Sequence, residues 1–84
     1  MNGVITLNGV EKTSVSDLKF EDIGVPNTKI TGAINTPHPF DSPSVLINQS
    51  GYNIIGTQYV FSSVVFKRIQ IKNDVWYFEA VGII

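Results

Sequence analysis

Hydrophobic and polar residues alternate in short runs along this chain, and no run keeps a helical period for long. The first run, Val4–Leu7, leads directly into Asn8-Gly9. Asn-Gly is the strongest short hairpin signal, because a type I′ turn needs a positive φ at both of its central residues. Val10 then begins the returning strand. The pattern therefore predicts a β-hairpin at the start of the chain.

Segment Ser14–Ile23 is the one place where a helix and a strand compete. Its apolar residues fit a helical face only loosely, although a serine is in position to cap the first turn. As a strand it has two faces, one with Ser16, Leu18 and Phe20 and the other with Val15, Asp17 and Lys19. We favour the strand and leave the helix open.

Lys29–Asn35 predicts the next strand, after a loop in which Pro26 fixes φ. Ile30 and Ile34 would face the core, with Gly32 between them on the same face. A glycine inside a strand often marks a bulge, a sharp bend or the close approach of another backbone. The opposite face would carry Thr31, Ala33 and Asn35.

Three prolines interrupt the alternation between Thr36 and Ser44. Proline cannot donate to a sheet ladder, so the segment is excluded from a central strand and favours a stiff, extended path. Val45–Ile47 is then predicted as a short strand, followed by a polar turn centred on Gly51. A further apolar stretch begins at Asn53–Ile55.

The last third of the chain is the most regular. Gln58–Ile71 is rich in β-branched and aromatic residues, and its alternation slips near Lys67-Arg68. A bulge there would account for a change of face. A tight turn, Lys72-Asn73-Asp74, leads into Val75–Gly82.

On this last strand the large apolar residues share one face, which carries Trp76, Phe78 and Ala80. We predict that the two strands form a hairpin at the centre of the sheet, with Trp76 and Phe78 as core anchors. Turn signals recur at a spacing of roughly 8–12 residues, which is typical of small barrels and sandwiches. The sequence thus predicts an all-β single domain over residues 1–84. It would be a small β-barrel or β-sandwich of about six to eight short, mostly antiparallel strands with a long C-terminal hairpin.

Composition indicates a thin core and a weakly charged surface. A chain of 84 residues without cysteine has no disulfide and no thiolate zinc site to support its core. Charged residues make up 15% and the net charge is −1, against about 25% charged residues in typical soluble domains. Such a surface repels other chains weakly, which suits packing among copies or partners. The same composition is also typical of β-rich domains in general, since Thr and Ser suit strands and turns.

The start of the chain, Met1–Val4, has neither a basic region nor a long apolar run, so no signal peptide is expected. No apolar run approaches the roughly 18 residues that a membrane helix needs. The absence of cysteine fits a reducing compartment. We therefore expect a cytoplasmic or virion location, without secretion by a signal peptide and without a membrane partner.

No residue pattern indicates catalysis, a metal or a cofactor. His38 is the only histidine, it lies between two prolines, and the nearest acid is Asp41. No Gly-x-Ser-x-Gly elbow presents a nucleophile. Glu21-Asp22 is the only adjacent acidic pair, without a calcium-loop pattern, and the glycines are too scattered to cradle a phosphate. We predict that the protein is not an enzyme and has no catalytic, metal-binding or cofactor-binding residue.

Two segments are candidate sites for a protein partner. The proline loop could present Phe40 as an anchor, since an aromatic residue on a rigid loop loses little entropy on binding. In the other interpretation, Phe40 folds back over an open end of the barrel. Two terminal isoleucines would fray into water unless they pack against this fold or a neighbour. The candidate residues are Pro37, His38, Pro39, Phe40, Ile83 and Ile84.

A nucleic-acid interface is the alternative. Small barrels such as OB-folds bind single strands with stacked aromatics and cations. The candidate cations are Lys67, Arg68 and Lys72, near the aromatics Tyr59, Phe61 and Phe66. Three cations make a thin patch for binding phosphates, and the core also needs these aromatics.

The sequence therefore favours a non-enzymatic structural or protein-interaction module within a larger assembly, with protein partners or copies of itself. Small bacteriophage virion components, such as capsid decoration proteins or tail and baseplate pieces, are of this type in composition. The alternative is an OB-like binding module for single-stranded nucleic acid or a small ligand.

Overall fold

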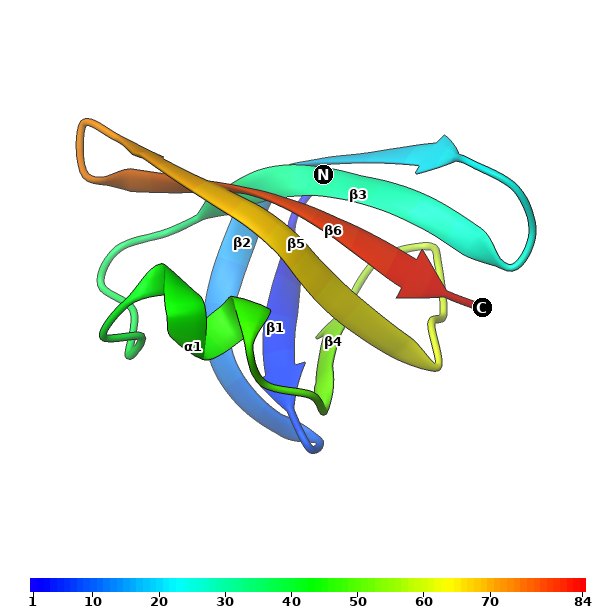
Figure 1. The fold of residues 1–84 in the computed structure, drawn as a ribbon, viewed down its shortest axis with the longest axis horizontal. Coiled ribbons are helices and arrows are strands. Elements are labelled where there is room, and N and C mark those ends of the chain that lie inside the picture. Colours follow the sequence, from blue (N-terminus) through cyan, green and yellow to red (C-terminus); the bar gives the residue numbers. More distant parts are fainter.

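In the computed structural model, which describes residues 1–84, six antiparallel strands form one sheet that curls into a half-barrel (Figure 1). The elements are β1 (Gly3–Leu7), β2 (Val10–Asp22), β3 (Asn27–Ile34), α1 (Pro43–Ile47), β4 (Tyr52–Ile55), β5 (Ser63–Lys72) and β6 (Val75–Ile83). Their order in the sheet is β4-β1-β2-β3-β6-β5, so β4 and β5 are its edges. The predicted all-β class, the antiparallel pairing and the number of strands are confirmed.

Both predicted hairpin turns are present. Asn8 and Gly9 join β1 to β2 with φ values of 50° and 82°. Asn73 and Asp74 join β5 to β6 with φ values of 50° and 65°. A positive φ at both central residues matches the right-handed twist of the flanking strands, so local turn chemistry sets the register of both hairpins.

The ambiguous segment Ser14–Ile23 is a strand, since β2 runs through it to Asp22. Its two faces are not those of simple alternation, because the pairing with β3 shifts between Ser16 and Lys19. Asp17 lies in this irregularity with a φ of 54°. An extra residue in one strand changes the face that follows it. Consequently Val15 and Leu18, predicted on opposite faces, are both buried in the core.

Gly32 on β3 marks the close approach that the sequence suggested. A β-carbon at this position would lie 2.9 Å from both Leu18 Cδ2 and Phe78 Cζ. The missing side chain therefore lets β2 and β6 bring large apolar groups together beneath β3. Ala33, expected to face outward, is nevertheless buried, because its small side chain lies between β2 and β6, its two neighbouring strands.

The C-terminal hairpin has the predicted shape but not the predicted place. Trp76, Phe78 and Ala80 are all buried along one face of β6, and the register shifts between Phe66 and Arg68, where a bulge was expected. The prediction of a central position is wrong. β6 pairs with both β3 and β5, whereas β5 has no strand on its other side. Sheet order depends on long-range pairing, which alternation within a segment does not reveal.

The prediction of a strand at Val45–Ile47 is also wrong, since these residues belong to the helix α1. Pro43 lies in the first turn, where the missing N–H has no helical partner to lose. Ser42 precedes it in an extended conformation, as an N-cap residue does. With five residues, α1 is the only helix, and no helix is long and apolar enough to cross a membrane.

Candidate functional site

The proline loop lies over one end of the half-barrel and turns its aromatic residue inward. Phe40 is only 8% exposed. Its ring centroid lies 6.3 Å from that of Tyr52 and 6.5 Å from that of Trp76. Of the two interpretations of Phe40, the structure favours the cover over the barrel end. Pro37 and Pro39 remain exposed on the outside of the loop.

His38 contacts residues of this cover and does not pair with an acidic residue. Its imidazole centroid lies 4.3 Å from the ring centroid of Trp76. Its Nδ1 atom accepts a hydrogen bond of 3.3 Å from the backbone N–H of Phe40. The only ion pair in the structure joins Lys29 to Glu79, so no carboxylate pairs with His38. The histidine therefore holds the loop against the core.

The C-terminus lies at the other end of the molecule, beside the turn between β2 and β3 (Figure 1). The carbonyl of Ile83 accepts hydrogen bonds from the backbone N–H and the Oγ of Ser62, at 2.7 and 2.9 Å. The N–H of Ile84 donates to the carbonyl of Pro26 at 3.0 Å. The backbone of both terminal isoleucines is thus anchored, yet the side chain of Ile84 is exposed.

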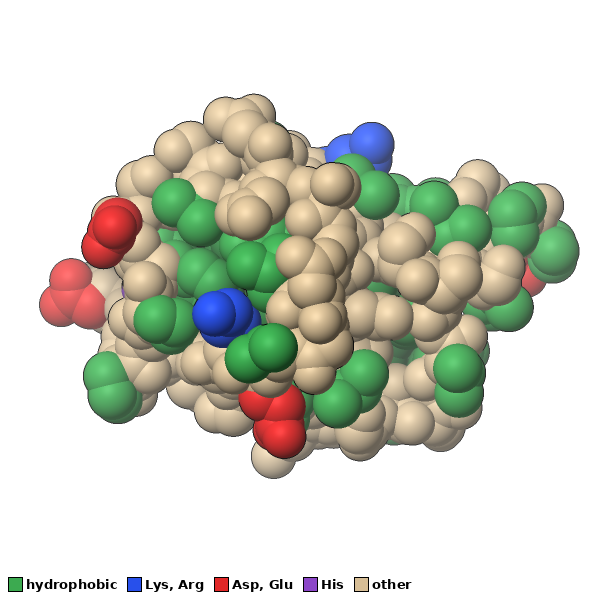
Figure 2. Space-filling model, turned by 90° about the horizontal axis from the view of Figure 1, so that it is seen from below, with side chains coloured by type: hydrophobic (Ala, Val, Ile, Leu, Met, Phe, Trp, Pro, Cys, Tyr) green, Lys and Arg blue, Asp and Glu red, His purple; other side chains and the backbone are tan.

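Ile84 belongs to a group of exposed aliphatic residues, which we call the apolar end. Its members are Ile23, Val25, Val60 and Ile84, exposed by 48%, 90%, 86% and 65%. They come from three chain segments that the hydrogen bonds of Ile83 and Ile84 tie together. Figure 2 shows several hydrophobic side chains at the surface of this end of the molecule, as well as others along the same face. The sequence pointed to the terminal isoleucines but not to the valines, which lie in loops.

The candidate cations Lys67, Arg68 and Lys72 are exposed along β5. The aromatic residues expected beside them face elsewhere, because Phe61 and Phe66 are buried in the core. Tyr59 is half-buried and stacks on Phe61, with ring centroids 5.8 Å apart. The structure therefore does not bring these cations together with a stacking platform of the predicted rings.

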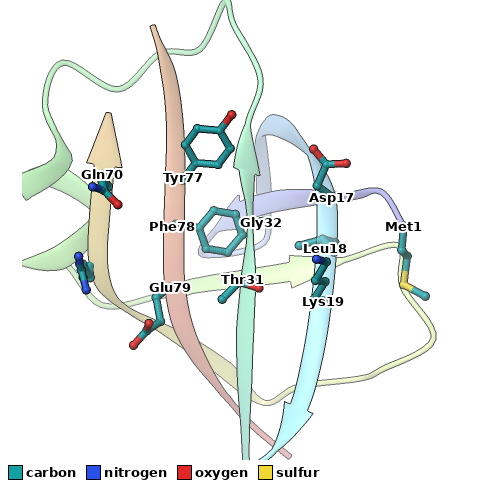
Figure 3. A pocket seen from close by; sticks show the side chains of 11 residues that line it. Met1, Asp17, Leu18, Lys19, Thr31, Gly32, Gln70, Tyr77, Phe78 and Glu79 are labelled. Atoms are coloured by element: carbon teal, nitrogen blue, oxygen red, sulfur yellow. The ribbon is translucent and has the colours of Figure 1, made fainter. Parts of the chain in front are cut away.

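A hollow of about 620 Å³ lies on the outer face of the sheet. Figure 3 shows Asp17 and Lys19 on β2 and Tyr77 and Glu79 on β6, on either side of β3. Arg68 also lines the hollow, from β5. Sequence reasoning missed this groove, because its residues come from strands far apart in the chain.

The groove combines charges of both signs with two aromatic residues, of which Phe78 is buried beneath it and Tyr77 is exposed. Tyr77 is 45% exposed, and Asp17 lies in the irregular part of β2 with a positive φ, which Asp tolerates better than most residues. Glu79 is engaged with Lys29 at 3.9 Å, but both side chains are well exposed, so the pair contributes little. No three His, Cys, Asp or Glu residues are grouped as metal ligands. The groove offers polar contacts on an open sheet face.

The outer edge of β5 is the other notable surface. Beside its first residues lies a second hollow of about 340 Å³, lined by Ile47 and Val65 among others. β4 approaches this part of β5 without joining it in the sheet.

In comparisons with known proteins, no protein-family model, no curated protein and no solved structure matches the chain.

Proposed function

We propose that the chain is a non-enzymatic structural or protein-interaction module that works within a larger assembly. The observation that carries the proposal is the apolar end. Val25 and Val60 are almost as exposed as in an unfolded chain, and the backbone of Ile84 is hydrogen-bonded to Pro26, next to Val25. A group of adjoining exposed apolar side chains typically marks an interaction site, whereas single exposed apolar residues are common on any protein surface.

The energetics of burial support an association at this end. Covering a fully exposed large aliphatic side chain contributes about 1.5–3 kcal/mol. Val25 and Val60 offer nearly this much each, whereas Ile23 and Ile84 are already partly covered and offer less. Part of this gain offsets the loss of rotational and translational freedom on binding. Val25, Ile84 and their neighbours lie on turns and a terminus that backbone hydrogen bonds already hold, so little further ordering is required.

We further propose that the assembly is a virion, with the chain as a capsid decoration protein or a tail or baseplate piece of a bacteriophage. Small size, sparse charge and a surface rich in neutral amides and hydroxyls support this type of role. The partner is another component of the assembly or another copy of the chain.

Co-expression with the products of the adjacent genes tests the proposal. The wild-type chain should co-purify with one of them, or with itself, in a fixed ratio measured by native mass spectrometry. The double variant Val25→Asp/Val60→Asp should lose at least about tenfold in complex, because charged groups would have to be desolvated in the interface. Asn48→Asp/Ser50→Asp adds the same charge at exposed positions elsewhere and should retain the complex. A wild-type chain that stays monomeric and takes up none of these products would contradict the proposal.

A further inference from the structure

The outer edge of β5 is the longest stretch of unpaired strand in the structure. β5 has ten residues and pairs with β6 only, whereas the other edge strand, β4, has four residues. β3 pairs with β6 as far as Trp76, so only the tip of the β5–β6 hairpin, at Lys72–Val75, projects beyond the sheet (Figure 1). An unpaired edge presents a row of N–H and C=O groups on which another strand can add.

The pairing of β5 with β6 assigns the faces of this edge. Ile69 and Ile71 lie opposite Phe78 and Trp76, which belong to the core face of β6. The outer face carries Arg68, Gln70 and Lys72, opposite Glu79, Tyr77 and Val75. Ile71 is 51% exposed although it shares the face of the core. A strand added beside β5 would cover it.

The charge of this edge has one sign. Lys67, Arg68 and Lys72 are half of the six basic residues in the chain, and Ser63–Lys72 contains no acidic residue. None of the three cations is in an ion pair. Glu79 lies opposite Arg68 on β6 and offsets part of its charge, since the exposed pair of Glu79 with Lys29 is weak. Lys72 lies opposite Val75, with no acidic residue across from it. Lys72, and Arg68 in part, can therefore meet acidic groups from outside the chain.

The same charges decide against a second copy as the occupant. Opposite charges directly across two strands stabilise the pairing, and like charges destabilise it. Antiparallel pairing of two β5 edges centred on Gln70, the register that aligns all of Arg68–Lys72, would place Arg68 of each copy against Lys72 of the other. The bulge between Phe66 and Arg68 also interrupts regular pairing upstream, so the regular part of the edge is Arg68–Lys72.

We propose that the edge Arg68–Lys72 accepts a seventh strand, an extended segment of a partner protein in which acidic and apolar residues alternate. Its acidic residues meet Arg68 and Lys72 on the outer face, and its apolar residues pack beside Ile69 and Ile71. This inference rests on the proposed function, since it names a second contact surface of the same module and the chemistry of what binds there.

Titration of the ¹⁵N-labelled full chain with synthetic peptides tests the inference. The probe is a short capped peptide that alternates glutamate and valine, and the matched control alternates lysine and valine. Backbone amide signals of Arg68–Lys72 should shift with the glutamate peptide. Binding of the lysine peptide should be about tenfold weaker or more, because two cross-strand pairs change from attraction to repulsion. The preference should shrink as salt is raised.

Two variants separate this edge from general charge effects. Arg68→Glu/Lys72→Glu should reverse the preference, so that the lysine peptide binds more tightly. Lys12→Glu/Lys19→Glu makes the same change of charge at exposed positions of β2 and should leave the preference unchanged. The glutamate peptide with N-methyl groups along one edge should not bind, because it cannot complete the ladder.

Shifts confined to other residues, equal binding of the two peptides, or a preference that survives the reversal of charge would each overturn the inference. A dimer that pairs through β5 would also overturn it. If the peptides fail while the complex that depends on Val25 and Val60 persists, this inference is wrong and the proposed function stands. If the peptides bind but no assembly forms, the proposed function fails separately.

Discussion

Both ends of the half-barrel carry apolar side chains, which are buried at one end and exposed at the other. At one end, α1 and the proline loop bury Leu46, Phe40 and Tyr52 in the core. At the other end, the side chains of Val25 and Val60 are exposed to solvent. The first group contributes to the free energy of folding, whereas the second is available for association. Residue type alone therefore does not tell which of the two roles an apolar side chain has.

For Val25, the length of the connection explains the difference. The chain between β3 and β4 is long enough to form α1 and to fold Phe40 back over the barrel. The connection between β2 and β3 is a short turn, closed by a hydrogen bond of 2.8 Å from the N–H of Asn27 to the carbonyl of Gly24. A turn this short cannot reach back over the core, so its valine points outward.

The largest expected effect is at the covered end. Leu46→Ala should lower the free energy of unfolding by about 2–5 kcal/mol, because it removes a fully buried side chain and leaves a cavity under α1. Ile84→Ala, at the apolar end, should change it by less than about 0.5 kcal/mol. Chemical denaturation followed by tryptophan fluorescence measures both. Equal effects would show that the two ends do not differ in solution as the structure indicates.

Features that depend on neighbouring residues could be predicted from the sequence. Asn8-Gly9 and Asn73-Asp74 form the expected turns, because their tolerance of positive φ is a local property. The alternation of Trp76 and Phe78 identified one face of the core, since the period of a strand is fixed by its pleat. These predictions required no knowledge of which strands pair.

Features that depend on distant segments could not be predicted. The edge position of β5 follows from the pairing of β6 with β3, which no local pattern in Ser63–Lys72 encodes. The outer groove joins Asp17 to Tyr77 only because β3 lies between their strands. Val45–Ile47 was misassigned because its β-branched residues outweighed the helix-start signal of Pro43. Periodicity within a segment therefore did not determine the strand order, which depends on long-range pairing. It also did not identify the helix that begins at Pro43.

A smaller effect at the covered end depends on pH. Burial raises the pKa of the Tyr52 phenol, whose hydroxyl lies 3.4 Å from the carbonyl of Val45. In the unfolded chain a tyrosine ionises near pH 10. Ionisation therefore favours the unfolded state from about pH 10 upward, and the stability that the neutral phenol provides is lost as pH rises through the folded pKa.

Tyr52→Phe should remove this alkaline loss and cost at most about 1 kcal/mol at neutral pH, because the hydrogen bonds it deletes are long. Urea denaturation at a series of pH values from 7 to above 10 measures the difference. Tyr77→Phe, at an exposed position, is the matched control and should keep the loss. An unchanged pH profile in Tyr52→Phe would show that the phenol does not control it.

The smallest expected effect is at the apolar end, in the double variant Val25→Ser/Val60→Ser. Both side chains meet water in the folded state almost as they do in the unfolded state, so little hydrophobic free energy is lost on substitution. The free energy of unfolding of the isolated chain should change by less than about 0.5 kcal/mol.

Denaturation at several protein concentrations distinguishes the causes of any larger change. A loss that appears only at high concentration would mean that another copy covers the wild-type apolar end, because association with the folded state adds stability by mass action. A loss of more than about 1 kcal/mol at every concentration would mean instead that the two valines pack within their own chain, and the contrast between the two ends would not hold.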